Sequence, residues 1–164
     1  MILLISICRE KLHELEFVKP IEEIAKKSGK VKVIHYSKLK NSEVNSADKI
    51  IICGTSLKDN DFLKPGNISK FRWIKSFKKP LLGICGGAHL IGLALGYKLK
   101  RKEEIGLKEL NLKDEFLGVK GKIQVYHLHQ FYALPEVFHK GNVYATLFHP
   151  EVRNKILIDN FAHL

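Results

Sequence analysis

The sequence predicts an α/β fold, in which helices flank a mostly parallel central sheet and extra antiparallel strands occupy the C-terminal half. Two observations predict it. In the first half, short apolar runs alternate with stretches of helical periodicity, an order that favours parallel strands covered on both faces. In the second half, strand-like runs follow one another with only short loops between them. A chain of 164 residues is expected to form a single domain over residues 1–164.

The expected parallel strands are short and apolar, as strands buried on both faces are. They cover residues 2–7, 31–36, 49–53 and 81–84. Apolar residues at helical spacing predict helices over residues 9–28, 68–77 and 88–95, with a polar loop or short helix over 38–48 and a loop over 59–66. Pro20 suits the first turn of the firm part of the first helix, and Gly29 suits its end.

The C-terminal half changes from helices to strands. Residues 104–112, 122–128 and 143–148 have strand character, with a turn region over 114–121 between the first two. Residues 152–164 carry apolar positions at helical spacing and predict a closing helix. Extra antiparallel strands are therefore expected in the C-terminal half.

The central stretch runs from Lys79 to Gly96, with the sequence KPLLGICGGAHLIGLALG. A buried strand leads into Cys85, glycines surround it, and an apolar helix follows, which is the Gly-x-Cys-x-Gly pattern of a nucleophile elbow. Small neighbours are needed there because the sharp turn strains the backbone of its central residue. A helix N-terminus also favours a thiolate. The alternative is a free cysteine that is buried as a small hydrophobic residue.

A second motif, Phe148-His149-Pro150-Glu151, stands near the C-terminus. A nucleophilic cysteine needs a base, and the base needs an orienting acid. His149 can accept the thiol proton. Glu151 lies two positions further on, so an extended chain places both side chains on the same side, and Pro150 limits the flexibility between them.

Together, the G-I-C-G-G elbow and the F-H-P-E motif resemble the class I glutamine amidotransferase family, and the order of elements is similar over nearly the whole chain. The resemblance implies a flavodoxin-like fold and a triad of Cys85, His149 and Glu151 that hydrolyses glutamine through a γ-glutamyl thioester. It implies no cofactor. It also implies that ammonia passes to a separate synthase subunit, as in the stand-alone amidotransferase subunits of GMP synthases, which are similar in size.

The resemblance also points to an oxyanion hole. In the family, the loop after the third strand supplies a backbone N–H, which here places Gly54 and Thr55 at the site, with Thr55 where a second glycine is usual. The second donor is expected to be the N–H of Gly86, the residue directly after the nucleophile.

Three histidines are candidates for binding substrate. The family normally has Gln four residues after the nucleophile, where this chain has His89, so a substrate hydrogen bond is altered. The family often has a His before a Leu-Pro, which here is His127 or His129. One of these two is expected at the mouth of the site and the other in a structural role. Their spacing also suits a metal pair on a strand, but no third ligand is evident and no metal is expected.

Composition sets the remaining expectations. The net charge of +11 comes from dispersed lysines, which indicates a solvated basic surface or an acidic partner, and aromatic residues are not interleaved as nucleic-acid binding would require. The three cysteines are too few and scattered for a disulfide framework or zinc site, so reduced thiols in the cytoplasm are expected. No run is long enough to span a membrane, and the apolar N-terminus is too short for a signal peptide.

Two other functions stay open. The chain is alternatively a related Cys-dependent hydrolase that acts on a γ-glutamyl or other amide, or a catalytically weak homologue, and His89 in place of Gln favours both. A binding protein that keeps the fold without catalysis is the third hypothesis, against which the joint presence of Cys85, His149 and Glu151 argues.

Overall fold

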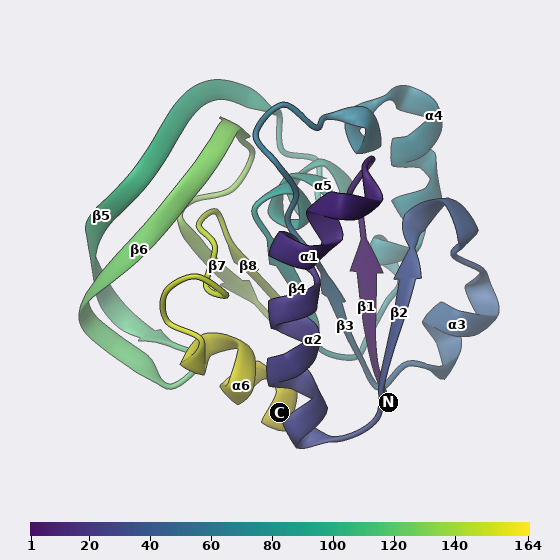
Figure 1. Ribbon diagram of the computed structural model, residues 1–164, viewed down its shortest axis with the longest axis horizontal. Coiled ribbons are helices and arrows are strands. Elements are labelled where there is room, and N and C mark those ends of the chain that lie inside the picture. The colour runs from purple at the N-terminus through teal and green to yellow at the C-terminus, as the bar shows by residue number, and fades with distance from the viewer.

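The computed structural model describes residues 1–164, and a six-stranded sheet forms its centre (Figure 1). The strand order is β2-β1-β3-β4-β8-β7, and every neighbouring pair is parallel except β7 with β8. The strands are β1 (Ile2–Ser6), β2 (Val31–His35), β3 (Lys49–Ile52), β4 (Leu81–Ile84), β7 (Val137–Lys140) and β8 (Val143–Thr146). The predicted α/β fold with a mostly parallel sheet is confirmed.

Helices cover both faces of this sheet, and an apolar core lies under each layer. On one face, α1 (Glu14–Phe17), α2 (Lys19–Ala25) and α6 (Ile156–His163) pack over the sheet with Phe17, Ile21 and Phe161 fully or almost fully buried. On the other face lie α3 (Asn41–Ser46), α4 (Pro65–Ile68), the 3-10 helix Ser69–Lys75 and α5 (Gly86–Ala94). Because helices cover both faces of the sheet, the side chains on both sides of β1 and β3 are buried, which is why these strands are continuous apolar runs.

A long antiparallel hairpin stands beside the sheet. Its strands are β5 (Lys100–Phe116) and β6 (Val119–Tyr132), which pair only with each other and curve around one side of the molecule (Figure 1). Leu112 and Phe116 from β5 and Val125 from β6 join the core beneath α6. The hairpin turn places Leu117 at a positive φ of 48°, and its carbonyl accepts a hydrogen bond of 2.7 Å from Asn160 Nδ2 on α6.

Several elements differ from the sequence-based expectation. The helical stretch over residues 9–28 is divided into 3-10 helix Lys11–His13, α1, α2 and 3-10 helix Lys26–Ser28, with Pro20 in the first turn of α2 and Gly29 directly after the last element. The expected helix over 68–77 begins earlier, at Pro65, and is mostly 3-10. The closing helix begins at Ile156, because Asn154 adopts a positive φ of 66° and the preceding residues form turns. Strand β7 was not predicted.

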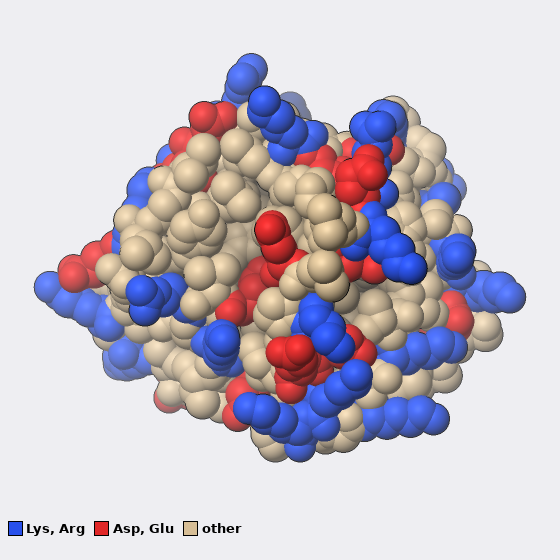
Figure 2. All heavy atoms as spheres, in the orientation of Figure 1, with Lys and Arg blue, Asp and Glu red and all other residues tan.

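The loops add two further short 3-10 helices, Tyr36–Lys38 and Asp61–Leu63. Charged side chains cover the visible face (Figure 2): Lys and Arg are dispersed around it, and carboxylates gather near its middle, over α1 and α2. This dispersion fits a solvated basic surface on this face. None of the helices has the length and apolar character that crossing a membrane would require.

Candidate active site

The candidate site lies at the carboxyl edge of the parallel sheet. Gly54 follows β3, Cys85 follows β4, and His149 comes shortly after β8. Because β4 lies between β3 and β8 in the sheet, these three chain segments emerge next to one another. Crevices outside the carboxyl ends of parallel strands are the usual ligand sites of such sheets.

The turn between β4 and α5 has the geometry of a nucleophile elbow. Cys85 has φ 49° and ψ −101°, a strained conformation for a residue with a side chain, and α5 begins at the next residue. The glycines are required by close packing: a Cβ on Gly87 would lie 2.2 Å from the carbonyl oxygen of Ile52, and one on Gly83 would lie 2.6 Å from the carbonyl carbon of Gly87. The sequence pattern therefore predicted the turn correctly.

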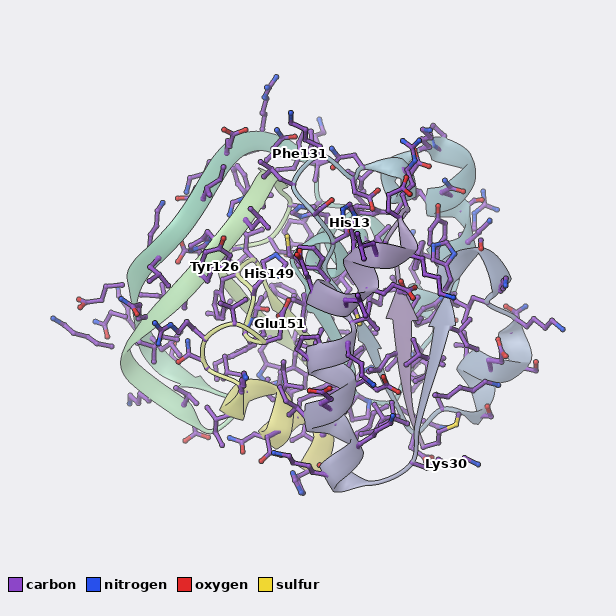
Figure 3. The ribbon with its side chains drawn as sticks, viewed as in Figure 1. His13, Lys30, Tyr126, Phe131, His149 and Glu151 are labelled. Carbon is purple, nitrogen blue, oxygen red and sulfur yellow. The ribbon has the colours of Figure 1, made fainter.

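His149 and Glu151 form a buried pair beside this turn. His149 Nδ1 lies 2.7 Å from Glu151 Oε1, and both side chains are essentially inaccessible to solvent. The backbone N–H of His149 donates a hydrogen bond of 2.9 Å to the carbonyl of Tyr126 on β6, so the hairpin fixes its position. Figure 3 shows His149 and Glu151 between the hairpin and α1.

Charge around His149 favours its protonated form. Burial by itself lowers the pKa of His149, but the nearby Glu151 carboxylate and the Cys85 sulfur outweigh it and raise the pKa well above its ordinary value. The Nε2 atom of the same ring is buried and makes no hydrogen bond. A ring held through Nδ1 with a free Nε2 is able to exchange a proton at that atom.

Gly54 fits between Cys85 and His149 and shows how closely they lie. A Cβ at Gly54 would be 2.6 Å from His149 Cε1 and 3.5 Å from Cys85 Cβ. Only a residue without a side chain allows the imidazole to occupy this position. The structure thus brings together Cys85, His149 and Glu151, which come from distant parts of the sequence.

The Cys85 sulfur is held from the side of the hairpin. Its thiol donates a hydrogen bond of 3.5 Å to the carbonyl of Leu128 on β6. The other two cysteines are chemically different, because burial raises the pKa of Cys8 to about 11 and that of Cys53 well above its ordinary value. Both therefore stay protonated thiols at neutral pH, whereas a cysteine reacts as a nucleophile in its thiolate form.

The residues expected to form the oxyanion hole lie near Cys85: Gly54 packs against it, and Thr55 and Gly86 line the same cavity as Cys85. The backbone N–H groups of Gly54, Thr55 and Gly86 donate no hydrogen bond within the protein. The Thr55 hydroxyl donates a hydrogen bond of 2.7 Å to Asp59 Oδ2, which holds Thr55 in position in the loop. The same carboxylate oxygen accepts a hydrogen bond of 2.6 Å from the backbone N–H of Arg9, so Asp59 joins the loops after β1 and β3.

A small cavity lies beside Cys85, with a volume of about 10 Å³. This is room for about one water molecule. The loop after β3 forms one wall, the end of β6 forms the other, and Gly86 and His89 line it from α5. Larger hollows occur elsewhere on the molecule, including one of about 840 Å³ beside Cys8, but Cys85 lines none of them.

Two of the three candidate histidines line the cavity, and the third does not. His89 and His129 line the cavity, whereas His127 is fully buried and lies 6.3 Å from the ring of Phe148 between ring centroids, outside the cavity wall. Burial lowers the pKa of His89 to about 3 and that of His129 to about 4, and it also lowers the pKa of His127. All three are neutral imidazoles at neutral pH.

Two residues of this region were missed by the sequence analysis. Asp59 was assigned only to a loop, because nothing in its neighbourhood shows that its carboxylate faces Thr55 and Arg9. Glu104 lies on β5 opposite His129 on β6, and one of its carboxylate oxygens is within 4.8 Å of a nitrogen of His127 and of His129, a juxtaposition that the sequence did not reveal. The contact of Asp59 with Arg9 and that of Glu104 with His129 join distant segments, so no local pattern signals them.

Comparison with known proteins shows the family to which this chain belongs. The family model for glutamine amidotransferase class-I matches residues 14–142. A glutamine-hydrolysing GMP synthase subunit of Thermoplasma acidophilum is 28% identical over 70% of this chain and 68% of its own. The imidazole glycerol phosphate synthase subunit HisH of Bacillus thuringiensis subsp. konkukian is 26% identical over 88% of both chains.

Solved structures show the same fold. A crystal structure described as that of a GMP synthase subunit from Thermoplasma acidophilum has a TM-score of 0.77 at 20% identity and covers 99% of this chain and 92% of its own. A glutamine amidotransferase from Thermotoga maritima has a TM-score of 0.67 at 16% identity and covers 92% of this chain and 76% of its own. Since the family model matches most of its length, this chain belongs to the class I glutamine amidotransferase family.

Proposed function

We propose that this protein hydrolyses glutamine to glutamate and ammonia, with Cys85 as nucleophile, His149 as base and acid, and Glu151 as the group that orients His149. The observation that carries the proposal is the buried His149–Glu151 pair, 2.7 Å from Nδ1 to Oε1, which packs beside Cys85 at a strained strand-to-helix turn. A nucleophile, a base within reach and a third group that orients the base are the parts that covalent amide hydrolysis requires.

The first half of the reaction forms a thioester. The Cys85 thiol turns from the Leu128 carbonyl toward His149 and transfers its proton to Nε2, and the thiolate attacks the side-chain carbonyl carbon of glutamine. The N–H groups of Gly54 and Gly86 hold the oxyanion that forms, as preorganised donors at the reacting carbonyl do. When the carbon–nitrogen bond breaks, His149 returns the proton to the leaving nitrogen and ammonia departs.

The second half restores the enzyme. His149 takes a proton from water, and the resulting hydroxide attacks the γ-glutamyl thioester carbonyl. The carbon–sulfur bond breaks, the proton on His149 passes to the Cys85 sulfur, and glutamate leaves. Throughout, Glu151 keeps Nδ1 protonated and stabilises the positive charge that appears on the ring.

We further propose that ammonia is transferred to a synthase on another chain. The two curated relatives are both named as subunits of synthases, one of them glutamine-hydrolysing. The cavity of about 10 Å³ also supports dependence on a partner, because a glutamine side chain enters only when the loop after β3 and the end of β6 separate. Contact with a synthase at this edge is one means of separating them.

The test measures glutamate release and covalent labelling by an electrophilic glutamine analogue, with and without a candidate synthase. Labelling at Cys85, located by peptide mass spectrometry, is the expected result. Cys8 and Cys53 act as controls within the same chain, because their raised pKa keeps them unreactive. Absence of label at Cys85 under every condition would remove the proposal.

A second candidate is a Cys-dependent hydrolase for other γ-glutamyl amides. The observation that favours it is His89, a buried neutral imidazole that lines the cavity and whose Nδ1 makes no hydrogen bond. This ring differs in shape and reach from the Gln side chain usual in the family. Turnover of a chromogenic γ-glutamyl anilide at a higher kcat/KM than glutamine would favour this candidate, and the reverse order would exclude it.

A further inference from the structure

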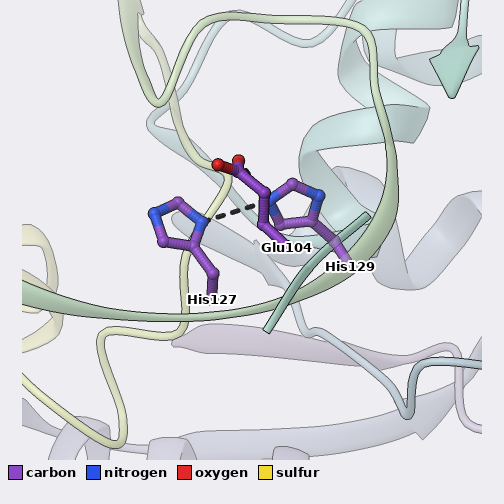
Figure 4. Close-up of side chains that lie close together, drawn as sticks. All are labelled: Glu104, His127 and His129. Carbon is purple, nitrogen blue, oxygen red and sulfur yellow. Dashed lines mark hydrogen bonds and ion pairs between the residues drawn. The ribbon is translucent and has the colours of Figure 1, made fainter. Parts of the chain in front are cut away.

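Three side chains of types that can ligate metal ions, Glu104, His127 and His129, meet on the β5–β6 hairpin (Figure 4). Glu104 on β5 stands directly opposite His129 on β6, and His127 lies two residues before His129 on the same face of the strand. His127 Nδ1 lies 3.0 Å from His129 Nε2, and His129 Nε2 lies 3.4 Å from Glu104 Oε2. One donor atom from each residue falls within 4.8 Å of the other two.

These side chains are buried with polar atoms left unpaired. Glu104 is 8% exposed, His129 2% and His127 not at all. His127 Nε2 and His129 Nδ1 make no hydrogen bond, and the other two ring nitrogens, His127 Nδ1 and His129 Nε2, face each other. Native proteins pair almost all of their buried polar groups, and here the two rings find few partners beyond each other and the Glu104 carboxylate.

The spacing of the donor atoms fits a metal ion. Four ligands in a tetrahedron about 2.0–2.1 Å from Zn²⁺ lie about 3.3 Å from one another. The two measured separations, 3.0 Å and 3.4 Å, are on either side of this value. Two imidazoles and one carboxylate are also a donor set that Zn²⁺ and its neighbours in the first transition series bind.

Charges around the cluster are compatible with binding. Glu136 Oε1 lies 4.0 Å from His127 Nε2, the ring nitrogen that faces away from His129, so a second carboxylate adds negative charge beside the cluster without a hydrogen bond to the ring. Lys102 lies 3.1 Å from Glu104 Oε2, and Lys108 pairs with Glu104 Oε1. Both lysine side chains are about half exposed, so they can swing into solvent when a cation takes their place.

We propose that Glu104, His127 and His129 bind one divalent transition-metal ion, with Zn²⁺ as the best fit. The ion joins β5 to β6 at one point of the hairpin. Leu128 lies between the two histidines, and its carbonyl accepts a hydrogen bond from the Cys85 thiol. The ion therefore also fixes the strand segment that lies against the candidate nucleophile. Three protein ligands leave a fourth position for water.

The test uses the Cys85→Ser variant, which removes the sulfur of the candidate nucleophile as a competing ligand. After treatment with a chelator, the protein is titrated with Co²⁺ while the visible absorption is recorded, and Zn²⁺ is then added as a competitor. We expect saturation at one Co²⁺ per chain and displacement by Zn²⁺. Because this variant lacks the proposed nucleophile, the result is independent of whether the protein hydrolyses glutamine.

Ligand variants locate the site. In the same background, Glu104→Gln and His129→Gln are expected to weaken Co²⁺ binding more than 10-fold, a loss at least as large as that seen when a group that merely orients a ligand is removed. Glu109→Gln and His139→Gln, at exposed positions on β5 and β7, are the matched controls and should bind as the parent does. Circular dichroism checks that each variant is folded.

A surface variant keeps the test valid if a buried variant fails to fold. Lys108→Ala removes a cation that competes for Glu104 and should tighten Co²⁺ binding several-fold, whereas Lys113→Ala, further along β5, should not. The proposal is overturned if the parent shows no saturable Co²⁺ binding. It is equally overturned if folded Glu104→Gln and His129→Gln variants bind like the parent, or if Lys108→Ala leaves the affinity unchanged.

Discussion

His149 Nδ1 and Glu151 Oε1 lie 2.7 Å apart in a part of the protein that solvent does not reach, and only Pro150 separates the two residues in the chain. A carboxylate at this distance keeps the proton of the imidazole on Nδ1, which leaves Nε2 free to accept a proton. The pair is therefore expected to act as a unit in both catalysis and stability.

Replacing Glu151 by Gln keeps the shape of the side chain and removes its charge. We expect kcat for glutamine hydrolysis to fall by about 10²- to 10⁴-fold, because the imidazolium loses its stabilising partner and its fixed tautomer. The pKa of His149 should also move down, since Glu151 is a main cause of its elevation. Rate measurements across pH and an NMR titration of the His149 ring check both effects. An unchanged titration would contradict the assigned role of the pair.

The same pair makes stability depend on pH. The pKa of His149 in the folded protein lies above its ordinary value of about 6.5. The unfolded chain therefore releases this proton first, and the stabilisation is fully present below about pH 6.5 and lost as the pH rises through the folded pKa. Urea unfolding between about pH 6 and pH 9 should show the advantage of the parent over Glu151→Gln shrinking with rising pH. A constant or growing advantage would contradict the prediction.

Gly54→Ala should displace the imidazole of His149. The new Cβ would lie 2.6 Å from His149 Cε1, a distance at which one of the two groups has to move. We expect a loss of about 1–3 kcal/mol in the free energy of unfolding, typical of an overpacked core, together with a large fall in kcat. Gly66→Ala is the matched control, because a Cβ there meets nothing within 4 Å. Equal activity of the two variants would show that Gly54 is not a close neighbour of the working base.

His89→Gln restores the residue that the family usually has at this position. A neutral buried imidazole is replaced by an amide, which offers both a donor and an acceptor to the substrate. We expect KM for glutamine to fall by about 5- to 10-fold, the value of one positioned hydrogen bond, while kcat changes little. His139→Gln, at an exposed position, serves as control. A higher KM in His89→Gln would mean that the histidine is itself the better substrate ligand.

Asp59→Ala should loosen the loop that carries Thr55. Its Oδ2 accepts hydrogen bonds from the Thr55 hydroxyl, which is buried, and from the Arg9 N–H, which is partly buried. Its loss leaves both donors without this partner, at a cost of about 1–3 kcal/mol. Because Asp59 is a positioning residue, kcat should fall more than KM rises. Asp61→Asn, which removes only an exposed ion pair with Lys64, should leave both constants near the parent values. Equal effects of the two variants would exclude the positioning role.

Local sequence was sufficient to predict the elements on which the candidate site is built. The glycines around Cys85 are needed by its own turn, and the two-residue spacing of His149 and Glu151 allows them to pair whatever the rest of the chain does. The alternation of apolar runs with helical segments likewise predicted the parallel sheet. Each of these depends on neighbours within a few residues, so it can be recognised in the sequence alone.

Tertiary structure decided the rest, because the groups concerned meet only when distant segments fold together. Asp59 reaches Arg9 and Thr55, Glu104 comes opposite His129 through the hairpin register, and the end of β6 closes the cavity beside Cys85. Strand β7 forms as an edge of a sheet whose other members lie far away in the chain, apart from its partner β8. Which residues meet across such separations depends on strand pairing and packing, and it cannot be predicted from the pattern of neighbouring residues.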